Sequence, residues 1–104
     1  MDKETLITGR RFAKALKRHM KVSQLILFGS RARKDHFVTS DYDFVLVSRE
    51  FSGKPFPRRA SELYKFWPSN FDLEVLCYTP EEWQRLKDKR GILLNAQREG
   101  IRLV

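Results

Sequence analysis

The sequence contains a single cysteine, Cys77. One thiol excludes a disulfide within the chain and a zinc site built on several cysteines. No apolar run approaches the ~20 residues that a membrane-spanning helix requires. Residues 1–11 lack the continuous apolar core of a signal peptide, and the chain has no internal repeat or low-complexity segment. Together these absences predict a cytoplasmic protein without a membrane segment.

Acidic residues are scarce relative to basic ones. The sequence has 13 Asp and Glu against 21 Lys and Arg, which gives a net charge of +8. Such a balance favours an anionic partner, whether nucleic acid, a nucleotide or an acidic protein surface, and does not choose among them. Scattered charges also serve simply to keep a surface solvated. At 104 residues the chain is expected to form one domain, residues 1–104, with a small core.

Hydrophobic periodicity predicts an alternation of helices and strands. The predicted helices cover residues 3–20, 58–66, 79–88 and 92–99, and the predicted strands cover residues 22–28, 42–48 and 71–78. The unbroken apolar run at residues 25–28 is typical of a strand covered on both faces. Thr79, Pro80 and Glu82 form a capping-box helix start. We expect a loop at residues 50–57, an αL cap at Gly100 and an apolar C-terminal tail at residues 101–104.

Two carboxylates stand at the start of the second predicted strand. The first apolar run ends on Gly29 and Ser30, and ten residues later Asp41-x-Asp43 leads into the second apolar run. Alternate residues of a strand share a face, so Asp41 and Asp43 point to the same side. Two such groups stay ionised together most easily with a cation between them. Mg²⁺ suits these hard oxygen ligands and binds through one or two carboxylates plus substrate phosphates.

The turn before these carboxylates carries features of a phosphate site. Gly29 allows the backbone to turn sharply and to approach a ligand. Arg31 and Arg33 add cationic groups beside the backbone N–H groups of the turn. Both arginines cannot point the same way on a helical turn, so we expect one to face the site and the other to face solvent or a partner. The stretch therefore predicts a site for a metal ion and a triphosphate.

The combination of Gly29-Ser30 with Asp41-x-Asp43 at this spacing is similar to the pattern of the polymerase-β-type nucleotidyltransferases. The sequence GSRAR…SDYDF resembles that of their smallest members, the minimal nucleotidyltransferases. The resemblance covers nearly the whole chain, because those proteins are about this size. The resemblance implies an α/β (α+β) fold, with a small mixed sheet and helices packed against it. Lys34 stands where this family usually has glycine, which affects the expected geometry of the loop.

The resemblance also implies a role for each motif residue. Gly29 and Ser30 hold the β- and γ-phosphates, with Arg31, Arg33 and Ser40 as further nucleotide-binding residues. Two Mg²⁺ ions are expected, and ATP is the expected donor. Asp41 and Asp43 bind the nucleotide-side ion, and a third carboxylate joins them at the acceptor-side ion. Asp72, at the start of the third predicted strand, fits that position, and Glu74 on the same strand face is the alternative.

Small proteins of this family commonly pair with a helical HEPN toxin and transfer AMP to one of its tyrosine hydroxyls. The resemblance thus implies an antitoxin that acts by AMPylation. An oligomer of this chain is a further possible assembly. The alternative is a non-catalytic antitoxin or a basic nucleic-acid-binding module that acts by docking alone. Nucleic acid is the less favoured partner, because carboxylates gathered on one face repel phosphate. Transfer to a small molecule is disfavoured, because the chain lacks an additional domain to hold it.

Overall fold

The computed structural model describes residues 3–33, 41–89 and 91–104. Its α-helices are α1 (Lys3–His19), α2 (Ser30–Arg33), α3 (Phe56–Arg59), α4 (Pro80–Leu86) and α5 (Ile92–Glu99), with 3-10 turns η1 (Arg49–Phe51) and η2 (Tyr64–Phe66). Its strands are β1 (Gln24–Phe28), β2 (Tyr42–Val47), β3 (Leu73–Tyr78) and β4 (Ile101–Arg102). Within the described ranges, no helix has the length and apolar character needed to cross a membrane.

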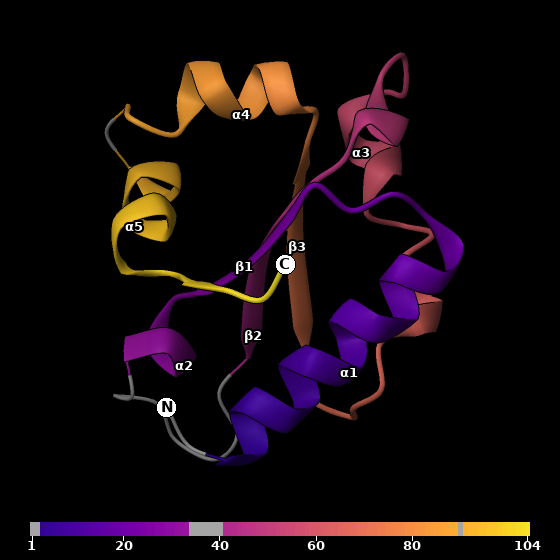
Figure 1. Ribbon diagram of the computed structural model, residues 1–104, viewed down its shortest axis with the longest axis vertical. Helices are drawn as coiled ribbons and strands as arrows, with labels where there is room; N and C mark the ends of the chain where they lie inside the picture. The colour runs from indigo at the N-terminus through magenta and orange to yellow at the C-terminus, as the bar shows by residue number, and fades with distance from the viewer. Residues whose placement is uncertain (1–2, 34–40, 90) are drawn as a thin grey trace.

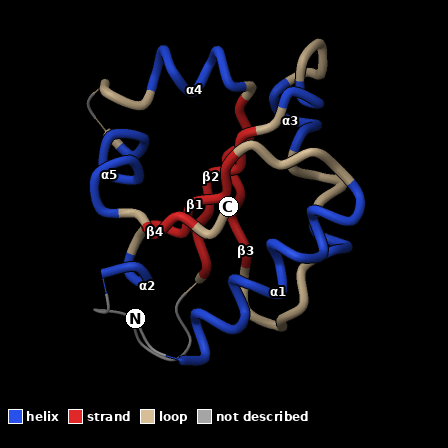
Figure 2. Tube along the Cα trace, viewed as in Figure 1, coloured by secondary structure: helices blue, strands red, loops and turns tan. Residues whose placement is uncertain are grey.

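The strands form one mixed sheet in the order β3-β2-β1-β4. β1 runs antiparallel to both β2 and β4, whereas β2 runs parallel to β3. The parallel pair requires a long connection, and α3 and η2 lie within it. Figure 2 shows the strands crossing the middle of the molecule with helices on either side. The predicted fold class, a small mixed sheet with helices packed against it, is confirmed.

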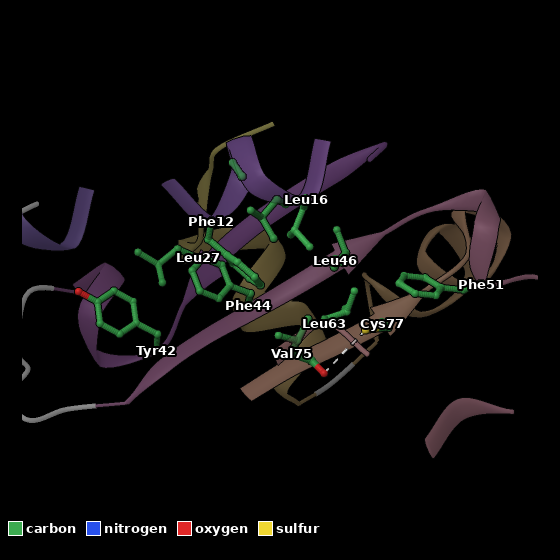
Figure 3. Packing of buried hydrophobic residues seen from close by; sticks show 12 residues of the cluster. Phe12, Leu16, Leu27, Tyr42, Phe44, Leu46, Phe51, Leu63, Val75 and Cys77 are labelled. Carbon is green, nitrogen blue, oxygen red and sulfur yellow. Dashed lines mark hydrogen bonds between the residues drawn. The ribbon is translucent and has the colours of Figure 1, made fainter. Parts of the chain in front are cut away.

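Both faces of the sheet are covered, as the apolar run in β1 predicts. Leu25 and Leu27 pack with Phe12 of α1 in one cluster, whereas Ile26 packs with Trp83 of α4 in a second. Figure 1 shows α1 on one side of the sheet and α4 and α5 on the other. Close packing of the first cluster is visible in Figure 3. The sheet is therefore the central layer. Along β2 and along β3, odd-numbered and even-numbered residues point to opposite faces of the sheet, so the parity of a residue number within a strand gives its face.

The prediction of one helix over residues 58–66 is wrong. The helix starts earlier, with Pro57 in its first turn, and ends at Arg59, before the separate turn η2. Arg59 is buried, and it donates hydrogen bonds to the Cys77 carbonyl and to both carboxylate oxygens of Glu82. Glu82 also completes the predicted capping box with Thr79. These long-range bonds to β3 and α4 explain why the local helical pattern does not decide this segment.

The C-terminal end also differs from the prediction. Residues 101–102 form the edge strand β4, which pairs with Ile26 and Leu27 of β1, instead of an apolar tail without secondary structure. Gly100 does not adopt the αL conformation, because its φ of −70° and ψ of 158° are extended. An extended Gly100 leads α5 directly into β4. The residues that follow do pack on the body, since the Leu103 amide donates to the Leu25 carbonyl.

Candidate active site

Asp43 lies at the centre of the candidate site. In the sheet it pairs with Phe28, the last residue of β1, and with Glu74 of β3. Residues paired across parallel strands point to the same face, so the side chains of Asp43 and Glu74 lie side by side. That face is the one covered further along by Val45 and Leu76, which belong to the cluster around Trp83. Asp41 directly precedes β2 and shares the parity of Asp43.

Charge repulsion is built into this group of carboxylates. The pKa of Asp43 is raised above its ordinary value, first by burial and then by the negative charges of Glu74 and Asp41, while the positive charge of Arg33 lowers it. Asp43 is half-buried, whereas Glu74 and Asp41 are exposed. A bound cation would relieve both the repulsion and the desolvation of the ionised form. The carboxylates therefore have the electrostatics of a cation site.

The glycine of the turn is in direct contact with this carboxylate. Gly29 has a φ of 77°, and a Cβ added there would lie 2.6 Å from Oδ2 of Asp43. The Gly29 carbonyl accepts hydrogen bonds from the Ala32 and Arg33 amides, which fixes the first turn of α2. Only glycine combines this backbone conformation with so close an approach. The predicted phosphate turn and the predicted metal-binding aspartate are thus immediate neighbours.

The two arginines of the turn occupy different environments. Arg33 is exposed, and its charge acts on Asp43. Arg31 is only 1% exposed and donates hydrogen bonds to Thr5 Oγ1 at 2.9 Å and to the Tyr42 hydroxyl at 3.0 Å. Tyr42 is on the opposite face of β2 from Asp43. Arg31, a predicted nucleotide-binding residue, thus faces neither the site nor solvent, and Arg33 is the arginine on the side of the carboxylates.

The third carboxylate has two candidates, and the structure places them differently. Glu74 lies within β3 in register with Asp43, whereas Asp72 is one residue before that strand begins. The Asp72 carbonyl accepts a hydrogen bond from the Tyr42 amide at 2.9 Å, so its backbone is anchored to the start of β2. Both side chains are exposed and have the same parity. The choice between them stays a prediction.

Two further positions fall outside the described residues. Ser40, a predicted nucleotide-binding residue, lies there, as does Lys34 at the family's usual glycine position. Ser30, by contrast, is partly buried as the first residue of α2.

The carboxylates of the site suit a metal ion that is also bound by phosphates. In the described part of the chain, no three His, Cys, Asp or Glu side chains are gathered closely enough to hold an ion by themselves. Mg²⁺, however, is usually bound by one or two carboxylates together with substrate phosphates. Asp43 with Asp41 or Glu74 beside the Gly29 turn fits that mode of binding. The residues present are therefore suited to a metal ion that arrives with a nucleotide.

The sequence did not predict the contacts of Arg31 with Tyr42 and Phe71 beneath the site. Tyr42 is fully buried, and its ring lies under the Arg31 guanidinium at 4.1 Å from Cζ to the ring centroid. The ring of Phe71 is 4.9 Å from the same atom. Alternation along β2 would have placed Tyr42 on the core face. Nothing in the sequence indicated that Arg31 joins it there.

The mixed sheet thus carries carboxylates on the adjoining strands β2 and β3, next to a glycine turn. The family model described as "Nucleotidyltransferase domain" matches residues 10–98, and the chain belongs to this family. The structure is similar to the crystal structure of a protein from Sulfolobus solfataricus that is provisionally described as a nucleotidyltransferase. The two share 27% sequence identity with a TM-score of 0.56, over 84% of this chain and 81% of the other. No curated protein matched the chain.

Proposed function

We propose that this nucleotidyltransferase moves AMP from ATP to a hydroxyl group in a Mg²⁺-dependent reaction, and that the acceptor is a tyrosine of a helical HEPN-type toxin. Family membership supports nucleotidyl transfer in general. The main observation in support is the contact between the Gly29 turn and Asp43, whose pKa is raised by burial and by the charges of Glu74 and Asp41. A metal-bound triphosphate would be held by backbone N–H groups of the turn on its phosphates and by negatively charged carboxylates on its metal ion.

Each part of the site has a separate task in this proposal. The turn at Gly29 and Ser30 receives the β- and γ-phosphates, and Arg33 adds positive charge beside them. Asp41 and Asp43 would hold Mg²⁺, which when bound neutralises the charge that develops on the phosphates during transfer. The acceptor oxygen attacks the α-phosphorus in line, and pyrophosphate leaves. The protein contributes mainly alignment, since phosphoryl chemistry needs little covalent participation from side chains.

The acceptor is expected on the β3 side of the carboxylates. The third carboxylate, Asp72 or Glu74, would serve the second ion of the predicted pair there. On the sheet face of Glu74, further along β3 at Leu76 and Tyr78, lies an apolar groove of about 490 Å³ between α3, β3, α4 and α5. Its lining is apolar except for Lys89, and the other lining residues are Phe56, Leu76, Tyr78, Leu86, Ile92 and Leu93. Phe56 is 47% exposed and Ile92 59%, which supports contact with a protein acceptor.

The test is to incubate the purified chain with labelled ATP, Mg²⁺ and the proteins that co-purify with it from its native cells, and to weigh the products. A partner protein that gains the mass of AMP, with the gain lost in Asp43→Asn, supports the proposal. Label only on RNA ends or on a small molecule would overturn the protein acceptor and leave nucleotidyl transfer in place. A partner neutralised equally well by wild type and by Asp43→Asn would support the alternative, an antitoxin that acts by docking alone.

A further inference from the structure

Arg31 makes an unusual set of contacts for a residue next to a phosphate turn. Its side chain is buried, and Nη1 donates to Thr5 Oγ1 on α1 and to the Tyr42 hydroxyl on β2. The guanidinium also lies over two rings, with Cζ 4.1 Å from the centroid of Tyr42 and 4.9 Å from that of Phe71. The two rings contact each other, at 6.0 Å between centroids. The side chain thus joins three separate segments.

The contacts with Tyr42 and Phe71 are with sequence neighbours of the candidate ligands. Tyr42 stands between Asp41 and Asp43, and Phe71 immediately precedes Asp72. Arg31 itself follows the Gly29-Ser30 turn directly. Figure 3 shows the Tyr42 ring at one end of the cluster, next to Phe44, with 6.4 Å between the ring centroids. The contacts all lie on the core face of the sheet, opposite the carboxylates.

We propose that Arg31 is a positioning residue, which fixes the phosphate turn relative to the carboxylate-bearing strand from the opposite face of the sheet. The inference rests on the proposed function, since it concerns how a metal ion would bridge two elements of that site. A metal ion would bind both the phosphates held by the turn and the carboxylates of β2. Its affinity therefore depends on the distance between the turn and β2. The planar guanidinium sets that distance, because Nη1 donates to two side chains while the group lies over two aromatic rings.

The chemistry of the side chain explains why another cation would not replace it. A guanidinium donates in a fixed fork and stacks on aromatic rings through its delocalised plane. A lysine ammonium has neither property, and its flexible stem would not hold Tyr42 and Phe71 in one arrangement. Substitution therefore loosens the relation between turn and strand even where the charge is retained.

The relation between turn and strand can be measured without turnover. In calorimetry of ATP binding with and without Mg²⁺, the ratio of the two affinities reports how well the metal bridges the turn and the carboxylates. We expect Arg31→Lys and Tyr42→Phe to reduce that ratio roughly tenfold, the effect of losing a buried hydrogen bond to a charged group. The affinity measured without Mg²⁺ should change less than twofold, because the turn itself is intact. Tyr42→Phe keeps the ring, so it provides a folded variant if Arg31→Lys does not fold.

A matched control separates positioning from general stability. Leu16→Ala removes a buried core side chain on α1 that makes none of the contacts described for Arg31, so it should lower the melting temperature and leave the ratio unchanged. If Arg31→Lys and Tyr42→Phe both show the same ratio of ATP affinities with and without Mg²⁺ as wild type, the positioning role alone is overturned. A wild-type ratio of one overturns the proposed metal-dependent function, and the positioning role with it.

Discussion

The Gly29 backbone and the Asp43 carboxylate are packed so closely that a Cβ at Gly29 would stand 2.6 Å from Oδ2 of Asp43. The contact joins the end of β1 to the side chain of its partner strand β2, where Phe28 and Asp43 are in register. Two separate features require glycine at position 29: the positive φ and the lack of space for a Cβ. The two features can be tested separately, because another glycine of the chain has only the first.

Gly29→Ala should reduce nucleotidyl transfer by roughly 100-fold, since the added methyl group displaces the Asp43 carboxylate from its position. The left-handed backbone adds a stability cost of about 1–2 kcal/mol. The matched control is Gly53→Ala, where φ is 79° and nothing lies within 4 Å of the added Cβ. Activity assays and thermal unfolding of both variants provide the comparison. Equal loss of activity in the two would show that backbone strain, and not contact with Asp43, is responsible.

The third carboxylate can be assigned by a pair of substitutions. We expect Asp72→Asn to reduce transfer by about 100-fold or more while ATP still binds, because this residue is predicted to serve the acceptor side. Glu74→Gln is the comparison, since Glu74 lies beside Asp43 in the sheet and contributes to its raised pKa. Single-turnover transfer and ATP affinity are measured for each. An inactive Glu74→Gln with an active Asp72→Asn would move the assignment two residues along the chain.

The raised pKa of Asp43 predicts how stability depends on pH and Mg²⁺. A carboxyl group whose folded-state pKa exceeds the unfolded value contributes stability below the unfolded value. This contribution is lost as the pH rises through the folded value. At neutral pH without Mg²⁺, Asp43→Asn should therefore melt a few degrees above wild type. Adding Mg²⁺ and ATP should stabilise wild type more than the variant. If the variant melts below wild type at neutral pH without Mg²⁺, burial and the neighbouring charges do not destabilise the ionised Asp43 as inferred.

The ion pair between Arg59 and Glu82 predicts a second, separate pH effect. Hydrogen bonds from Arg59 and Thr79 lower the pKa of Glu82 to about 2. This stability is present above the unfolded-state pKa of a glutamate and is lost as the pH falls through about 2. Glu82→Gln should cost about 1 kcal/mol at neutral pH, because the capping box and the ion pair are both weakened. Glu81→Gln, an exposed neighbour, is the control, and acid unfolding curves that coincide for all three proteins would contradict the prediction.

The confirmed predictions rest on periodicity and local motifs. The unbroken apolar run of β1 indicated a strand covered on both faces, and Thr79, Pro80 and Glu82 indicated the start of α4. The split of residues 58–66 was missed, because Arg59 is drawn into bonds with Cys77 and Glu82 far along the chain. The strand β4 was missed because two residues carry no detectable alternation, and it is defined by its pairing with β1.

For the candidate site, the sequence by itself determined the turn, the Asp-x-Asp pair and the shared face of its carboxylates. All three follow from neighbours in the chain and from the period of a strand. Only the tertiary structure decided that Glu74 pairs with Asp43, since the register of β2 against β3 depends on the packing of both sheet faces. It also decided that Arg31 is buried while Arg33 stays exposed. Local spacing separates two residues on a short helix, but the burial of a charge depends on the partners that the rest of the fold brings to it.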